Sequence, residues 1–203
     1  LLPADKAILA KECAAQLADA CDYHGAGTIE YIYDLDRNQL YFMEMNTRLQ
    51  VEHPVTELVS GVNIVFQQFE IAKGKSIESL AIGDEGYAFE VRINAERVSV
   101  KNDEIKVEPT PGKVERCEFP ERKDITRIVT VAAGKSVPPY YDNLIAQLVS
   151  YGKDRNDAIN KMLAYLKSVT LEGISSNIPL LMYILQDDVF LSGDYDTDYL
   201  PGL

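Results

Sequence analysis

The feature that most constrains the fold is a change of periodicity near residues 76–86. Before this stretch, apolar residues recur every three or four positions in two segments, as on one face of a helix. After it, apolar side chains occupy every second position from Tyr87 to Ile93, which is the period of a half-buried strand. The sequence therefore predicts an α+β chain in two parts, residues 1–82 and 83–203, with a mainly antiparallel sheet and flanking helices in the second part.

Each part is predicted to contain several secondary-structure elements. Those of the first part are, in order, a helix over residues 5–25, strands over 27–33 and 39–46 joined by a polar connector, and one helix over 54–74. Those of the second part are strands over 87–94, 113–119, 126–132 and 144–151, a helix capped by Asn156, and a helix that begins near 177–179.

Composition and charge exclude several classes of function. The chain has 203 residues, of which 46% are apolar and 26% charged, so it can bury a core. Its net charge of −12 argues against binding to nucleic acid or to an anionic membrane, because both require a basic excess. No apolar run of about 18 residues is present, so we expect no membrane-spanning segment. The 3 cysteines have no metal-ligand spacing and are expected to be reduced thiols in a reducing compartment.

Two glutamates lie in the pair of strand-like runs of the first part. If Tyr33 pairs with Gln39, Glu30 and Glu44 are diagonal neighbours on one face, roughly 7–8 Å apart. If Tyr33 instead pairs with Tyr41, Glu30 and Glu44 lie directly opposite each other. A register that differs by one residue places them on opposite faces of the ribbon. The alternation of polar and apolar residues that begins at Thr28 favours a shared polar face.

A shared face would make these glutamates candidate metal ligands. Two carboxylates held close together repel each other, and a hard divalent cation would offset that repulsion. Asn46 lies two residues beyond Glu44 on the same face and adds a third oxygen. Mg²⁺ typically takes one or two protein carboxylates and completes its shell with phosphate oxygens and water. Glu30, Glu44 and Asn46 are therefore candidate metal ligands, and the alternative is a solvated polar face on an ordinary hairpin.

The loop after the second strand combines a cation, neutral donors and a base. Arg48 presents a planar fork that suits a flat, bidentate oxyanion such as bicarbonate. Gln50 and the backbone amide of Val51 can donate to the same anion, and Glu52 can accept a proton. This combination indicates a site that binds and deprotonates a small anion. The alternative from the residues alone is a surface loop with an Arg–Glu ion pair.

Several stretches of the sequence resemble one family. Residues 25–30, Gly-Ala-Gly-Thr-Ile-Glu, and residues 44–57, Glu-Met-Asn-Thr-Arg-Leu-Gln-Val-Glu-His-Pro-Val-Thr-Glu, resemble biotin carboxylase, and the second match is long and specific. Further stretches that resemble later elements of this family are residues 89–96, 109–113, 137–142 and 171–177. The resemblance covers nearly the whole chain, although residues 98–108 and 118–127 match no motif and Ala146-Gln147 stands where the family commonly has Gly-Lys.

The resemblance implies a fold and a reaction. The first part would be the C-terminal portion of an ATP-grasp domain, and the second a biotin carboxylase C-terminal domain. In the family's reaction ATP phosphorylates bicarbonate, and the carbon dioxide that follows carboxylates biotin. The roles that the resemblance assigns are metal binding by Glu30, Glu44 and Asn46, bicarbonate binding by Arg48, Gln50 and Val51, deprotonation of bicarbonate by Glu52, and binding of the biotin anion by Arg92. The catalytic residues would be Arg48, Glu52 and Arg92.

The strand pattern supports the role of Arg92 independently. Arg92 lies on the polar face of its predicted strand with Glu90 and Asn94, so its guanidinium can point into a cleft. A cation aimed at a developing oxyanion stabilises it strongly where water is scarce. The alternative is an arginine paired with Glu90 on a hydrated sheet face.

The resemblance also implies cofactors and partners. The cofactors would be ATP, Mg²⁺ or Mn²⁺, and biotin on a separate carrier, because no lysine lies between two methionines as a biotin-attachment site. The partners would be a biotin carboxyl carrier protein or domain, a carboxyltransferase and a second copy of the subunit. The location would be the cytoplasm, or the mitochondrial matrix in a eukaryote.

Two further expectations concern the chain by itself and its alternatives. The chain has no glycine-rich phosphate loop, so we expect it to be inactive in isolation. One alternative function is that of another ATP-grasp ligase, such as a carbamoyl-phosphate synthase. The other is a non-catalytic module that serves dimerisation.

Overall fold

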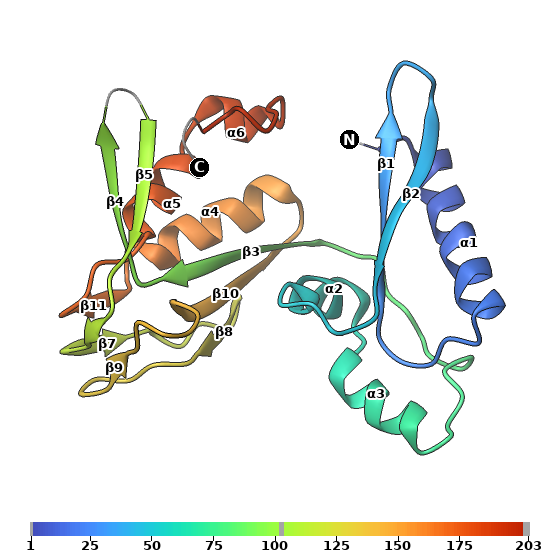
Figure 1. Cartoon of the computed structure of the whole chain (residues 1–203), viewed down its shortest axis with the longest axis horizontal. Helices are drawn as coiled ribbons and strands as arrows, with labels where there is room; N and C mark the ends of the chain where they lie inside the picture. Colours follow the sequence, from blue (N-terminus) through green and yellow to red (C-terminus); the bar gives the residue numbers. More distant parts are fainter. Residues whose placement is uncertain (1, 102–103, 201–203) are drawn as a thin grey trace. The chain divides into compact units, whose positions relative to one another are not determined.

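The computed structural model describes residues 2–101 and 104–200 and divides into two compact units, Leu1–Gly83 and Asp84–Leu203 (Figure 1). The elements of the first unit are α1 (Ala4–Ala20), β1 (Thr28–Asp34), β2 (Gln39–Asn46), α2 (His53–Ser60) and α3 (Ile64–Ala72). The strands form an antiparallel ribbon, and the hydroxyl of Tyr31 on β1 donates to the carbonyl of Ala10 on α1 at 3.3 Å. Among the described residues of this unit, only Pro54 and Glu70 are buried.

The predicted single helix over residues 54–74 is wrong, because two helices occupy this stretch. Gly61 has a φ of +70°, a left-handed conformation that ends α2 and that glycine adopts without strain. Asn63 then caps α3, since its side chain accepts a hydrogen bond from the backbone N–H of Phe66 at 2.7 Å. The apolar stripe on which the prediction rested continues across the break, so periodicity alone did not reveal it.

Two other helix ends also differ from the prediction. The first helix ends at Ala20 rather than near Gly25, because Asp22 turns the chain with a φ of 49°. The helix predicted to be capped by Asn156 is capped by Asp154 instead, whose carboxylate accepts from the backbone N–H of Asp157 at 2.8 Å. In both places several neighbouring polar residues can end or cap a helix, so the sequence alone does not decide which of them does.

The second unit contains the larger sheet. Its elements are β3 (Tyr87–Asn94), β4 (Glu96–Lys101), β5 (Glu104–Pro109), β6 (Gly112–Lys113), β7 (Arg116–Glu118), β8 (Ile125–Val129), β9 (Ser136–Val137), β10 (Leu144–Gly152), α4 (Arg155–Leu166), β11 (Thr170–Glu172), α5 (Ile178–Ile184) and α6 (Asp188–Ser192). Strands β3, β10 and β8 form a three-stranded sheet in that order, and the remaining strands pair as β4–β5, β6–β9 and β7–β11. All of these pairings are antiparallel, which confirms the predicted α+β class.

The core of the second unit lies where α4 packs on β3 and β10. Val91 and Ile93 point into it from β3, in agreement with the alternation in the sequence. Tyr165 on α4 is fully buried, and its hydroxyl donates to the carbonyl of Pro120 at 2.9 Å. Each fully buried apolar side chain contributes about 1.5–3 kcal/mol relative to exposure. This core therefore holds β3 rigidly by one face, and the other face carries its polar residues.

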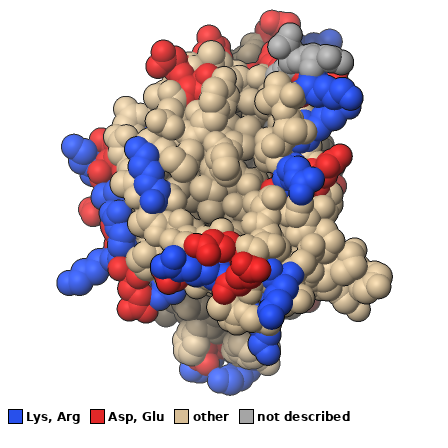
Figure 2. Space-filling view, turned by 90° about the vertical axis from the view of Figure 1, so that its left-hand side faces the viewer, with Lys and Arg blue, Asp and Glu red and all other residues tan. Residues whose placement is uncertain are grey.

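Charged side chains of both signs are interspersed on the face that Figure 2 shows. Several of the cations in the second unit are neutralised locally, in the ion pairs Arg116–Glu118, Arg116–Glu172, Arg122–Asp124 and Arg127–Glu121.

The cysteines Cys13, Cys21 and Cys117 are free. Within the described ranges, no helix has the length and apolar character needed to cross a membrane.

Candidate functional site

Glu30 and Glu44 lie directly opposite each other in the β1–β2 ribbon. At the turn end of the ribbon, Asp34 pairs with Gln39 and Tyr31 with Phe42. The register then shifts by one residue, so that Glu30 pairs with Glu44. Without this shift the two carboxylates would be on opposite faces. Glu30 and Glu44 share one face of the ribbon, as the sequence led us to expect. The register is not the one in which Tyr33 pairs with Gln39, because Tyr33 pairs with Leu40.

The side chain of Asn46 joins the two carboxylates. Its amide nitrogen donates to Glu30 Oε1 at 2.8 Å and to Glu44 Oε1 at 3.1 Å. Thr28 pairs with Asn46 in the next step of the ribbon, so these side chains share one face. Asn46 thus offsets part of the repulsion between the carboxylates, and the three predicted metal-ligand candidates form one cluster.

The donor set of this cluster fits a hard divalent cation. The two carboxylates supply oxygen ligands that Mg²⁺ and Mn²⁺ prefer, and Asn46 would add its amide oxygen once a cation replaces its N–H bonds to them. Among the described residues, no group of three His, Cys, Asp or Glu side chains could hold a metal ion. A cation at Glu30, Glu44 and Asn46 would therefore take its remaining ligands from outside the protein, such as phosphate oxygens and water.

The loop after β2 is held in a tight turn that leads into α2. The Nδ1 atom of His53 lies 2.7 Å from the carbonyl oxygen of Gln50, and the backbone N–H of His53 donates to the same oxygen at 3.3 Å. Pro54 is buried in the first turn of α2, where its missing N–H costs nothing. These contacts fix the backbone of the loop, so its exposed side chains project from a rigid base.

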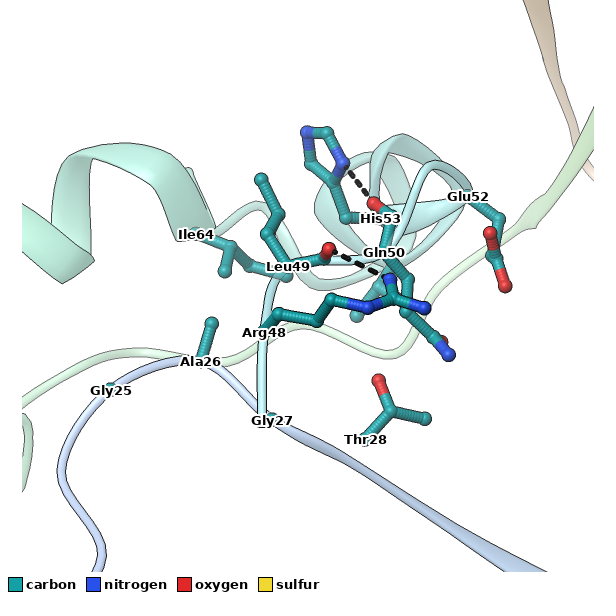
Figure 3. A pocket seen from close by; sticks show the side chains of 11 residues that line it. Gly25, Ala26, Gly27, Thr28, Arg48, Leu49, Gln50, Glu52, His53 and Ile64 are labelled. Carbon is teal, nitrogen blue, oxygen red and sulfur yellow. Dashed lines mark hydrogen bonds between the residues drawn. The ribbon is translucent and has the colours of Figure 1, made fainter. Parts of the chain in front are cut away.

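Arg48, Gln50 and Glu52 line a single open pocket of about 480 Å³ in the first unit. Figure 3 shows the guanidinium of Arg48 and the amide of Gln50 side by side, with the carboxylate of Glu52 at the same end of the pocket. The guanidinium donates to the carbonyl of Leu49 at 3.3 Å and remains exposed. The structure thus brings together the cation, the neutral donor and the base that the sequence analysis singled out.

The pocket also contains residues that the sequence analysis did not assign to it. Thr28 lines it together with the glycine-containing turn of residues 25–27 and with His53 (Figure 3). A period of two places Thr28 on the face of Glu30, and that signal could have found it. Val51, whose backbone amide was expected to bind bicarbonate, is 40% exposed as a residue and is absent from the lining.

Arg92 belongs to the second unit. It lies on β3 opposite Gln147 of β10, and its side chain is 48% exposed. Its Nε atom is 3.9 Å from Glu90 Oε1, and the side chain of Glu90 is only 8% exposed. The predicted polar face of Glu90, Arg92 and Asn94 is therefore real. Arg92 is half exposed at the surface, beside a buried carboxylate.

Comparisons with known proteins identify the family of the chain. The sequence matches the biotin carboxylase C-terminal domain over residues 90–202. Residues 1–80 match the ATP-binding domain of the carbamoyl-phosphate synthase L chain. The chain is 41% identical to biotin carboxylase 1 of Bacillus subtilis over 191 residues, which are 93% of the chain and 41% of that protein.

Two other relatives extend the comparison. The chain is 41% identical to the mitochondrial propionyl-CoA carboxylase alpha chain of Caenorhabditis briggsae, with 94% of the chain and 26% of that protein covered. The biotin carboxylase domain of Hydrogenobacter thermophilus 2-oxoglutarate carboxylase, solved as a dimer with MgADP, ADP and bicarbonate, has a TM-score of 0.87. The identity to this domain is 35%, and the match covers 98% of the chain and 43% of the domain. The chain spans about 41% of the length of the first relative that it matches. Because the C-terminal domain match covers more than half of its residues, the chain belongs to the biotin carboxylase family.

Proposed function

We propose that the protein containing this chain carboxylates biotin on a carrier protein or domain, using MgATP and bicarbonate. The observation that carries the proposal is that the Glu30–Glu44 pair and the pocket of Arg48 lie next to each other on the β1–β2 ribbon. Thr28 lines the pocket of Arg48, Gln50 and Glu52, and it shares a face with the Glu30–Glu44 pair. A metal-phosphate site beside a pocket for a flat anion suits phosphoryl transfer to that anion.

The residues of the pocket have distinct tasks in this proposal. Arg48 holds bicarbonate by two parallel hydrogen bonds, and Gln50 donates a further one. The backbone amide of Val51 would complete the set of donors. Glu52 accepts the bicarbonate proton, which makes an oxygen of the anion a better nucleophile toward phosphorus. The tight turn around His53 keeps these groups in a fixed arrangement, which lowers the entropic cost of orientation.

Glu30, Glu44 and Asn46 would hold Mg²⁺ or Mn²⁺. When bound there, the metal ion neutralises charge on the transferring phosphates. Asn46 already donates to both carboxylates, so it sets their separation before the cation arrives. Arg92 has the last task, which is to oppose the negative charge on the biotin ureido oxygen as its nitrogen becomes nucleophilic.

The proposal extends to partners and location. A biotin carboxyl carrier and a carboxyltransferase would act with the protein, and the subunit would form homodimers. Related chains include bacterial biotin carboxylases and a mitochondrial carboxylase subunit. The cytoplasm, or the mitochondrial matrix of a eukaryote, would then be the place of action. The acyl acceptor is chosen by a different domain in such enzymes.

A second candidate is favoured by the match of residues 1–80 to the carbamoyl-phosphate synthase ATP-binding domain. Both functions use bicarbonate and ATP, so the discriminating reactant is the nucleophile. The test supplies full-length protein with MgATP and bicarbonate, and then with either biotin or ammonia. Formation of carboxybiotin supports the proposal. Formation of carbamoyl phosphate, with no effect of biotin, would favour the second candidate.

A further inference from the structure

Strand β3, which carries Arg92, is the edge strand of its sheet. One side of it bonds to β10, and the other side is left for a different partner. Backbone groups of residues two apart point to the same side of a strand. The carbonyl of Arg92 and the N–H of Asn94 therefore share the free edge, where an unpaired strand is prone to fray.

Asn177 occupies this free edge. Its amide nitrogen donates to the carbonyl of Arg92 at 3.0 Å, and its amide oxygen accepts from the backbone N–H of Asn94 at 2.9 Å. The backbone N–H of Asn177 also donates to the carbonyl of Asn94 at 3.3 Å. Asn177 is only 8% exposed and lies 85 residues from Arg92 in the sequence. Asn177 therefore takes the place of a neighbouring strand at Arg92 and Asn94.

The alternative role for Asn177 is the capping of a helix. It does precede α5, and asparagine is a common residue in that position. Its side chain, however, makes no capping hydrogen bond to α5. Both polar atoms of the side chain are used on β3 instead. Substitution of Asn177 thus removes bonds to the Arg92 segment and does not remove a side-chain cap.

A second set of hydrogen bonds holds the far end of the same segment. The amide nitrogen of Asn94 donates to Glu96 Oε1 at 3.0 Å, and that of Asn143 donates to the same oxygen at 2.8 Å. The backbone N–H of Ala95 donates to the carbonyl of Asn143 at 2.8 Å. The backbone beyond Asn94 is therefore held without Asn177. The distinct contribution of Asn177 is its hydrogen bond to the carbonyl of Arg92.

We propose that Asn177 is a positioning residue for Arg92, which it holds against the biotin anion by fixing the free edge of β3. This inference rests on the proposed function, because Arg92 acts there on biotin. Asn177 would act through Arg92 and not by contact with the substrate. The bicarbonate pocket is built from residues of the first unit, so the first half of the reaction does not depend on this edge.

The test uses the full-length protein and two substitutions of Asn177. Asn177→Ala removes both side-chain bonds. Asn177→Asp keeps the volume and the acceptor for the Asn94 N–H but removes the donor to the Arg92 carbonyl. Asp154→Ala is the matched control, because it removes a structural hydrogen bond at α4 of the same unit without touching β3. Each protein is assayed for carboxybiotin formation, with kcat and KM for biotin, and for bicarbonate-dependent ATP hydrolysis without biotin.

We expect both Asn177 variants to lower kcat for biotin carboxylation by about 10- to 100-fold, because a small displacement of a catalytic group has effects of that size. Their bicarbonate-dependent ATP hydrolysis should change by less than about twofold, and Asp154→Ala should leave the ratio of the two activities unchanged. Parallel losses of both activities, or an unchanged ratio in the Asn177 variants, would overturn the inference.

Two further outcomes have defined meanings. If Asn177→Ala does not fold, Asn177→Asp decides the question, because it preserves packing and one of the two bonds. If the unsubstituted protein forms no carboxybiotin, the proposed function itself fails. An active parent with an unchanged activity ratio in Asn177→Asp contradicts only the positioning role.

Discussion

Glu30 and Glu44 face each other across the β1–β2 ribbon because the strand register slips by one residue beside them. The slip turns a pairing that would separate the carboxylates into one that joins them. Bulges of this kind commonly re-aim side chains next to active sites. The amide of Asn46, within 3.1 Å of both carboxylates, then holds the pair together.

Glu44→Gln in the full-length protein should raise the Mg²⁺ concentration needed for half-maximal ATP hydrolysis. The substitution keeps the shape of the side chain but removes one of two negative charges at the proposed cation site. We expect a shift of about tenfold or more, as for other changes to the ligands of a bound metal. Glu12→Gln, on the exposed side of α1, is the control and should leave the titration unchanged. An identical Mg²⁺ titration for Glu44→Gln would remove the metal assignment.

Arg48→Lys should raise KM for bicarbonate by about tenfold or more, because lysine keeps the charge but loses the planar fork that binds two oxygens at once. KM for ATP should change much less, since the proposed contacts of Arg48 are with bicarbonate. Arg37→Lys, in the ribbon turn, provides a control at an exposed arginine. Steady-state kinetics with varied bicarbonate measure the effect. Equal changes in both KM values would argue against a bicarbonate-specific role.

Arg92→Ala should reduce carboxybiotin formation by about 100- to 1,000-fold, the size of effect expected from losing one donor to a developing oxyanion. Bicarbonate-dependent ATP hydrolysis should remain within about tenfold of the parent value, because it does not require the biotin anion. The two activities are measured on the same preparation. Comparable losses in both would show that Arg92 serves folding or nucleotide binding instead.

Asp124→Asn should lower the stability of the second unit at neutral pH. The guanidinium of Arg122 donates to both carboxylate oxygens of Asp124, at 3.0 and 2.6 Å, and these hydrogen bonds hold the pKa of Asp124 below its usual value of 3.8. A pKa lowered by folding stabilises the folded state above the unfolded pKa, and that contribution disappears as the pH falls through the folded value.

The expected loss for Asp124→Asn is about 1 kcal/mol at pH 7, because the pair is bidentate but partly exposed. The difference from the parent chain should begin to shrink as the pH falls below 3.8, where the unfolded carboxyl is protonated, and it should vanish once the pH is below the lowered pKa of the folded state. Urea unfolding followed by circular dichroism at several pH values measures it. Asp84→Asn, at an exposed carboxylate, is the control. A loss that is independent of pH would contradict an electrostatic origin.

The sequence was informative where short-range periodicity carries the structure. Alternation predicted strand β3 with Arg92 on its polar face, and it favoured the shared face of Glu30 and Glu44. It could not reveal the register slip of the ribbon, since a bulge leaves the residue types unchanged. The break at Gly61 was missed because the apolar stripe continues through it.

Contacts between distant residues were also beyond the sequence. Strands β4 and β5 pair over most of the described residues of 98–108, a stretch for which the sequence offered no motif, and they show weak alternation. The contact between Asn177 and Arg92 joins residues 85 positions apart. Such contacts are set by packing of the whole unit around α4, and local propensity does not encode them.

The origin of the oxygen atoms in the released phosphate tests the central claim most directly. Bicarbonate labelled with ¹⁸O is supplied to full-length protein with MgATP and biotin, and the phosphate is analysed by mass spectrometry. If Arg48, Gln50 and Glu52 present bicarbonate as the nucleophile, a bicarbonate oxygen bonds to the γ-phosphorus and stays there when carbon dioxide leaves. The account predicts one labelled oxygen in each phosphate formed. Phosphate without label would show that water attacks ATP, and it would contradict the account.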